Sequence, residues 1–213
     1  MQAIDRPNEV GITHGLAVVV YKVKGSHDER VLNALGPQFD TQFVLTGDEI
    51  GKIKPENVLE LGSNTGPNLV LLKQKFPELK IAGIDANPDA IRFAKHIWPE
   101  ADWRVGDILQ PLPYEDKSFD VILCDAVLMY VAPSEIESVM KEINRVAKKA
   151  VLIIDWFDDS KDGVEKDWHW ARSYHRWLRD LGFGLVWHRK LEEHEWPVTK
   201  KWQNNGHIFV GRR

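Results

Sequence analysis

The sequence predicts an α/β fold, in which a doubly wound, mostly parallel seven-stranded sheet is closed by an antiparallel C-terminal hairpin. Three observations predict it. From about residue 58 onward, short apolar runs alternate with segments of helical periodicity. The run at 119–124 is apolar enough to be buried on both faces, as strands of a parallel sheet are. The last two runs, 184–187 and 207–210, read as strands with no helix between them, so we expect them to pair as a hairpin.

The first two strand–helix units carry the clearest signals. A strand is expected at 58–62, followed by a helix with Pro67 in its first turn, where a missing N–H is tolerated. The second strand is expected at 81–85. Asn87 then supplies an N-cap for the next helix, because its side-chain oxygen can accept from free backbone N–H groups.

The later units follow the same plan. Two further strands are expected at 103–107 and 150–154. Ser134 and Glu137 have the spacing of a capping box and predict a helix start at Ser134. A last helix is expected to run from about Trp170 to Gly182, since glycine commonly ends helices.

Length and charge limit the domain organisation and the partners. A chain of 213 residues can bury one sizeable core. We expect a single α/β domain over 51–213, while 1–50 fit no strand–helix unit and are predicted to form an N-terminal extension or partial lid. The net charge of −4 and the absence of a Lys/Arg run leave no electrostatic signature of nucleic-acid binding. A small molecule is therefore the expected partner.

The N-terminus and the cysteine content predict a cytoplasmic protein. The first six residues lack a basic stretch leading into an apolar one, as a secretory signal would have. The apolar run at 16–21 is far shorter than the roughly 20 residues that span a bilayer. Cys124 is the only cysteine, so no intrachain disulfide can form, which fits a reducing compartment. We expect no membrane association.

The strongest local motif is the heptad Glu-Leu-Gly-Ser-Asn-Thr-Gly at 60–66, between a predicted strand and a predicted helix. Glycine lets the backbone approach a ligand closely and adopt angles closed to other residues. The helix that follows directs its free N–H groups at the same place. A tight turn that binds nothing is the alternative, because glycine-rich turns are common.

Two acidic residues strengthen the case for a nucleoside-containing ligand. Asp85 ends the second strand 23 residues after Gly62, where a carboxylate can accept from both ribose hydroxyls. Its alternative role as a helix cap is already filled by Asn87. Asp107 ends the third strand and can accept from an adenine amino group, or it can serve only as a turn residue.

The motifs at 60–66, 84–87, 106–108 and 118–122 resemble, in this order, those of class I S-adenosylmethionine (SAM)-dependent methyltransferases, which have a Rossmann-like fold. The resemblance runs from about residue 56 to 157 and extends to the closing hairpin. It implies that the chain is an enzyme with SAM as its cofactor and S-adenosylhomocysteine (SAH) as its product.

The resemblance also assigns cofactor contacts. The implied residues are Glu60, Gly62, Ser63, Asn64, Gly66, Asp85, Ala86, Asn87, Asp107, Ile108, Cys124 and Asp125. The five from the glycine loop would hold the methionine part. Asp85 would hold the ribose, the residues at 86–87 and 107–108 would surround the adenine, and those at 124–125 would border the methyl group.

A narrower resemblance concerns the acceptor. The segments 60–72 and 184–189 are similar to methylases associated with pseudaminic acid biosynthesis, which would imply a nonulosonic sugar or another surface-glycan precursor. The sequence departs from that pattern in its first 50 residues and at 191–203. Both regions can contribute to a substrate pocket.

Class I enzymes share no universal catalytic residue, so candidates rest on position. Asp125 is expected nearest the methyl group, Tyr130 and Asp155 follow predicted strands, and His169 is favoured because an imidazole titrates near neutral pH. The alternatives are structural: a backbone-bonded carboxylate, a packing tyrosine and a histidine on a helix surface.

Substrate contact is expected at two of the nine tryptophans, Trp156 and Trp168, with core packing as the alternative. The histidines show no ligand-like spacing with Cys, Asp or Glu, so no metal is expected.

Two other functions compete with methyl transfer to an O or N atom of a small molecule. Methylation of DNA or RNA bases is not one of them, because residues 125–128 lack the Asn/Asp-Pro-Pro-Tyr/Phe motif of the enzymes that perform it. A nicotinamide-dependent oxidoreductase would need Gly-x-Gly-x-x-Gly, but Asn64 replaces the second glycine. A non-catalytic protein that keeps the SAM-binding fold is the other alternative, distinguished by SAM binding without turnover.

Overall fold

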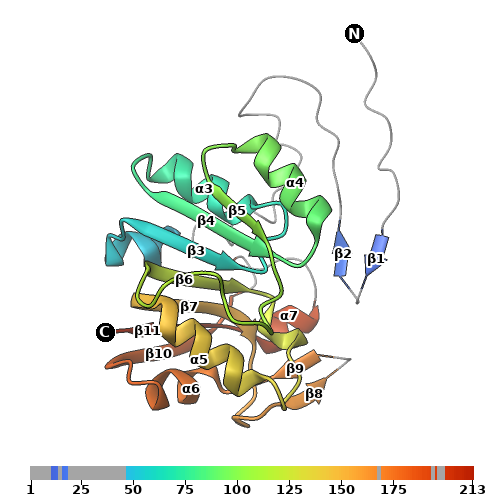
Figure 1. The fold of residues 1–213 in the computed structure, drawn as a ribbon. Coiled ribbons are helices and arrows are strands. Elements are labelled where there is room, and N and C mark those ends of the chain that lie inside the picture. Colours follow the sequence, from blue (N-terminus) through green and yellow to red (C-terminus); the bar gives the residue numbers. More distant parts are fainter. Residues whose placement is uncertain (1–10, 14–15, 19–46, 167–168, 193–194, 196–199) are drawn as a thin grey trace.

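The computed structural model describes residues 11–13, 16–18, 47–166, 169–192, 195 and 200–213. A seven-stranded sheet with the strand order β10-β11-β7-β6-β3-β4-β5 forms its centre (Figure 1). The strands are β3 (Asn57–Leu61), β4 (Lys80–Asp85), β5 (Asp102–Val105), β6 (Phe119–Asp125), β7 (Ala147–Trp156), β10 (Leu185–Lys190) and β11 (Gly206–Arg212).

Helices cover both faces of this sheet. They are α3 (Pro67–Lys75), α4 (Pro88–Ile97), α5 (Ile136–Val146) and α6 (Tyr174–Asp180). The apolar residues of α3 and α4 belong to one buried cluster and those of α5 and α6 to another, on the opposite face. The chain therefore changes face between β3 and β6, and a crevice forms at such a switch point at the carboxyl ends of the strands.

Strand β6 shows why the sheet needs cover on both sides. Val121 and Leu123 pack with the α3–α4 cluster, whereas Ile122 and Cys124 pack with the α5–α6 cluster. All four are 0% exposed, which confirms the two-sided burial predicted for this strand.

The C-terminal strands close the sheet as predicted. β10 pairs antiparallel with β11, and β11 pairs antiparallel with β7, while the five central strands pair in parallel. A small ribbon of β8 (Val164–Lys166) and β9 (His169–Ala171) is inserted between β7 and α6. The prediction that no helix separates the last two strands is wrong, because α7 (Lys200–Asn205) lies between β10 and β11 in the sequence. None of the helices in the described ranges is long and apolar enough to cross a membrane.

The predicted extension at 1–50 lies largely outside the described residues. Its described parts include the short pair β1 (Gly11–Thr13) and β2 (Leu16–Val18). Residues 47–53 are helical and pack on the domain, with Ile50 fully buried and Glu49 accepting a hydrogen bond from Arg212 at 3.2 Å.

Two helix starts differ from the predictions. The capping box at Ser134 does not form: α5 begins at Ile136 without a side-chain cap, because the Ala132 carbonyl already accepts from the N–H groups of Glu135 and Ile136. Trp170 lies in β9 rather than in a helix, since pairing with Glu165 extends that segment, and α6 begins only at Tyr174.

Candidate active site

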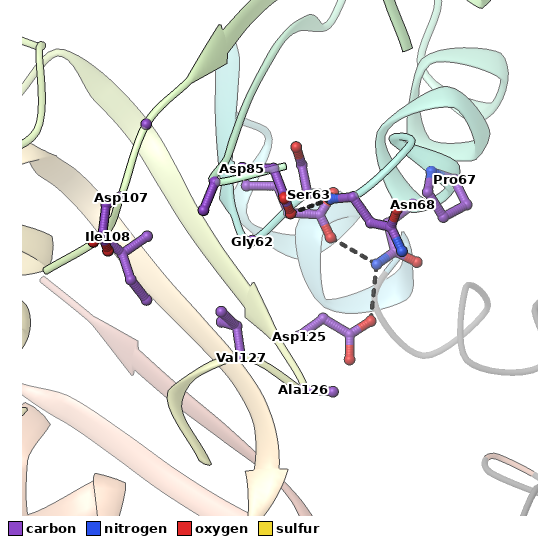
Figure 2. A pocket seen from close by; sticks show the side chains of 14 residues that line it. Gly62, Ser63, Pro67, Asn68, Asp85, Asp107, Ile108, Asp125, Ala126 and Val127 are labelled. Carbon is purple, nitrogen blue, oxygen red and sulfur yellow. Dashed lines mark hydrogen bonds between the residues drawn. The ribbon is translucent and has the colours of Figure 1, made fainter. Parts of the chain in front are cut away.

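A cavity of about 310 Å³ opens at the carboxyl ends of β3, β4 and β6 (Figure 2). It lies at the switch point described above. Its lining residues are Glu60, Gly62, Ser63, Asn64, Pro67, Asn68, Asp85, Ala86, Gly106, Asp107, Ile108, Asp125, Ala126 and Val127. Nine of the twelve predicted cofactor residues are among them.

The glycine loop forms one wall of the cavity because of its backbone geometry. Gly62 has φ of +68°, and a Cβ there would lie 2.5 Å from Val127 Cγ2, so a larger residue would collide with the opposite wall. The N–H groups of Gly62 and Ser63 donate to the Ile84 carbonyl at 2.9 and 3.1 Å, which fixes the loop to β4.

Three predicted cofactor residues do not line the cavity. Gly66 has φ of +80°, and a Cβ there would lie 2.3 Å from Trp103 Cη2, so this glycine makes room for a buried tryptophan. Asn87 caps α4 by accepting from two backbone N–H groups. Cys124 is fully buried in the core behind the cavity, and burial raises the pKa of its thiol well above the usual value.

Asp85 links the glycine loop to the turn after β4 while it lines the cavity. One carboxylate oxygen accepts from Asn64 N and the other from Asn87 N, both at 2.8 Å. Each oxygen retains acceptor capacity for a ligand hydroxyl. Asp107 also lines the cavity and accepts from Leu109 N at 2.9 Å, so its predicted role as a turn residue is compatible with ligand contact.

Asn68 joins a buried carboxylate, that of Glu60, to a half-buried one, that of Asp125, at the cavity wall. Its Nδ2 donates to Glu60 Oε1 at 2.7 Å and to Asp125 Oδ2 at 2.8 Å. Burial raises the pKa of Glu60 well above the usual value, and burial likewise raises the pKa of Asp125 to about 7, although the Asn68 hydrogen bond opposes both shifts. Sequence reasoning missed Asn68; the available signal was an amide in the first turn after the glycine loop.

Several buried polar atoms of the cavity wall are available for a ligand. Within the described part of the chain, Glu60 Oε2, Ser63 Oγ and Asn64 Oδ1 have no hydrogen-bond partner. Buried polar atoms are normally satisfied, so such a group at a cavity indicates a ligand that carries donors. The ammonium group of SAM is such a donor, and the residues present therefore fit this cofactor.

Two buried charged residues hold the turn that follows β6, which includes the short helix η1 (Leu128–Tyr130). Arg172 is 0% exposed and donates to the carbonyls of Leu128, at 2.9 Å, and Val131. Asp155 is also 0% exposed and accepts from Met129 N at 2.9 Å and from Trp156 N at 2.8 Å. Asp155 is not among the residues that line the cavity, and each of its oxygens accepts from a backbone N–H, so the described geometry gives its predicted role as a base no support.

The predicted acceptor-side residues that the structure describes lie together. The rings of Tyr130 and Trp156 each lie 4.9 Å, centroid to centroid, from the imidazole of His169. His169 is half-buried on β9, not on a helix surface as its alternative reading assumed. Trp202, which sequence reasoning missed, packs edge-on against Trp156. Trp168 lies outside the described residues.

This aromatic group adjoins the cavity. Ala126, which lines the cavity, packs against the buried cluster that contains Met129, Trp156 and Ala171. Ala126 also has φ of 51°, which is unusual for a residue with a side chain, and such backbone strain tends to occur at functional sites. The turn after β6 thus connects the cavity to the aromatic residues.

Comparison with known proteins agrees with this geometry. Residues 58–150 match the family model of a methyltransferase domain. The chain is 34% identical over 98 residues to the demethylmenaquinone methyltransferase of Thermotoga maritima, with 46% of this chain and 42% of the relative covered. The chain thus spans less than half the length of that curated relative.

Solved structures show the same fold at low sequence identity. A candidate O-methyltransferase of Nostoc punctiforme has a TM-score of 0.65 at 17% identity, with 85% of this chain and 58% of the other covered. Human N-acetylserotonin methyltransferase, solved in complex with SAM, has a TM-score of 0.57 at 19% identity, with 82% and 51% covered. The solved structures thus share the fold of this chain, and the family model of a methyltransferase domain matches the part of it that contains the glycine loop and the strands around the cavity.

Replacing Arg172 should unfold or loosen the turn after β6. In Arg172→Met, the Leu128 and Val131 carbonyls lose a buried cationic donor, and we expect a loss of roughly 3–5 kcal/mol in the free energy of unfolding. Urea denaturation measures it, with Arg176→Met, an exposed arginine on α6, as the control. Equal stability of the two variants would contradict this account of the turn.

Proposed function

We propose that the chain binds SAM in this cavity and transfers its methyl group to an oxygen or nitrogen atom of a small molecule. One observation supports this most directly: Glu60, Asp85 and Asp125 lie at the carboxyl ends of three neighbouring parallel strands around the glycine loop, and Glu60 Oε2 is buried with no partner among the described residues. SAM supplies an electrophilic methyl group on a positively charged sulfur, and so needs an anionic, water-poor site.

The lining residues divide the cavity by chemistry. Asp85 has oxygens suited to the ribose hydroxyls, and Asp107 with Ile108 offers an acceptor and an apolar surface for the adenine. Glu60 and Ser63 face the place of the amino-acid part, because their unpartnered oxygens need donors.

The acceptor side of the site extends from Asp125 toward the aromatic residues. Asp125 lines the cavity, and with a pKa of about 7 its carboxylate can take a proton from an acceptor group at neutral pH. Tyr130 and His169 belong to the aromatic group that adjoins the cavity through Ala126, and Tyr130 is 38% exposed. We infer that these three residues orient and deprotonate the acceptor.

The acceptor class we propose is a small polar molecule, with a sugar or surface-glycan precursor as the specific candidate. The aromatic faces of Tyr130, Trp156 and His169 can stack on a sugar ring, and carboxylates can bind its hydroxyls. The relative from Thermotoga maritima is named for a small-molecule acceptor, demethylmenaquinone. This supports a small molecule as the acceptor but does not support a sugar.

Cofactor binding tests the first part of the proposal. Isothermal titration of the wild type with SAM and SAH should show binding that Asp85→Ala loses by about 10–100-fold, because two charge-assisted acceptors are removed. Asp85→Asn, which keeps one oxygen for the backbone, should fall between them. Glu137→Gln on the surface of α5 is the control and should bind as the wild type does. Binding of NAD without binding of SAM would refute the proposal.

Methyl transfer to a panel of sugars, amines and carboxylates tests the acceptor side. For an accepted compound, His169→Ala should raise the KM of the acceptor or lower kcat by about tenfold or more, since a contact worth 1–2 kcal/mol is lost. The Kd of SAM should stay within about twofold. His96→Ala, an exposed residue on α4, serves as the control. A changed SAM affinity with unchanged acceptor kinetics would place His169 outside the acceptor site.

A further inference from the structure

The ionisable side chains of the cavity wall are all acidic. Four of the lining residues carry carboxyl groups, namely Glu60, Asp85, Asp107 and Asp125. Among the described residues that line the cavity, none is a lysine, an arginine or a histidine. A cationic ligand therefore enters a site whose own ionisable groups are all acids.

Two of these acids share one amide and lie in a buried setting. Glu60 is 2% exposed, and Asn68 donates one hydrogen bond to it and another to Asp125. In Figure 2 these two bonds are drawn as dashed lines that meet at the Asn68 amide. The second oxygen of Glu60 has no partner in the described part of the chain and belongs to the cavity wall. This oxygen is the independent sign that a ligand with a donor or a positive charge belongs here.

Acidic groups act on this pair from the neighbouring strands. Asp85 on β4 and Asp125 on β6 both disfavour the ionised form of Glu60, and Asp125 in turn acts on Asp155 of β7. Cys124 on β6 is a further titratable group beside them, and Arg172 acts on Asp155 from beyond β7. Mutual repulsion and burial both favour a proton on the pair until a cation arrives.

We propose that the Glu60–Asn68–Asp125 group senses the charge of the bound ligand: it releases a proton to solvent when a cation binds and so favours the sulfonium of SAM over the neutral thioether of SAH. The inference rests on the proposed function. Transfer of the methyl group removes one positive charge from the cofactor, so the group regains its proton and the binding of the product weakens.

The direction of the effect follows from the charges. The pKa of both carboxyls is raised by burial in the free protein, and a nearby positive charge lowers it, so binding of SAM shifts protons off the pair. Because Asp125 has a pKa of about 7, we expect release of roughly half a proton to one proton per SAM at pH 7. Release with SAH should be smaller, since its net charge is lower by one.

Titration calorimetry in two buffers of different ionisation enthalpy at pH 7 measures the protons released. The wild type should release more protons with SAM than with SAH. Glu60→Gln and Asp125→Asn keep the shape and the Asn68 contact but cannot titrate there, and at least one of them should lower the release with SAM by about half or more. Glu137→Gln, the same chemical change on the surface of α5, is the matched control and should match the wild type.

The outcomes separate this inference from the proposed function. Equal proton release with SAM and SAH on the wild type overturns the inference, even if neither variant folds. Unchanged release in both folded variants also overturns it. Because the ligand's amino group is expected at Glu60, its own protonation can change in Glu60→Gln; Asp125→Asn keeps the Glu60 carboxyl and separates the contribution of the carboxyl pair from that of the ligand. Binding of SAM without release of protons overturns only this inference. Absence of SAM binding at any pH overturns the proposed function as well.

Discussion

The burial of carboxylates at the point where the sheet changes face is the constraint on which the rest of the site depends. Glu60 and Asp125 lie at the carboxyl ends of the adjacent parallel strands β3 and β6, so their side chains come close together; Glu60 is 2% exposed and Asp125 is half-buried. Asn68 stabilises both from the first turn of α3. That contact fixes the helix over the cavity, and with it the glycine loop that leads into the helix.

The same principle of a buried charge held by backbone organises the acceptor side. Arg172 donates to a carbonyl of the short turn after β6, and Asp155 accepts from an N–H group of the same turn. These bonds fix the position of the turn although it is not part of a long helix or strand. Gly163 makes room for the Arg172 side chain, because a Cβ there would lie 2.9 Å from Arg172 Nε. The inserted β8–β9 ribbon brings His169 against Tyr130, and the proposed acceptor site would include this local insertion.

Most of the fold could be predicted from the sequence because hydrophobic periodicity and turn residues report local geometry. The alternation of strands and helices, the closing hairpin and the capping role of Asn87 followed from such signals. The capping box at Ser134 did not form, since a competing turn uses the Ala132 carbonyl. Which of the two turn arrangements forms depends on tertiary packing, and the spacing of residues in the sequence does not reveal it.

Residues of the candidate site could be predicted where their place follows from the end of a strand. They could not be predicted where their role comes from a contact with a residue far away in the sequence. Asp85 and Asp107 could be placed because strand ends converge at one edge of a parallel sheet. Asn68 and Arg172 could not, because their importance arises from partners 57 and 44 residues away in the sequence. Cys124 was assigned to the cavity as a neighbour of Asp125, but alternation along β6 turns its side chain into the core.

A crystal structure of the protein with SAH tests the central claim most directly, namely that the cavity at the carboxyl ends of β3, β4 and β6 is the cofactor site. We expect density for the ribose at Asp85, for the adenine between Ala86 and Ile108, and for the amino group at Glu60 Oε2. SAH bound elsewhere on the domain, or bound with its ribose away from Asp85, would contradict it.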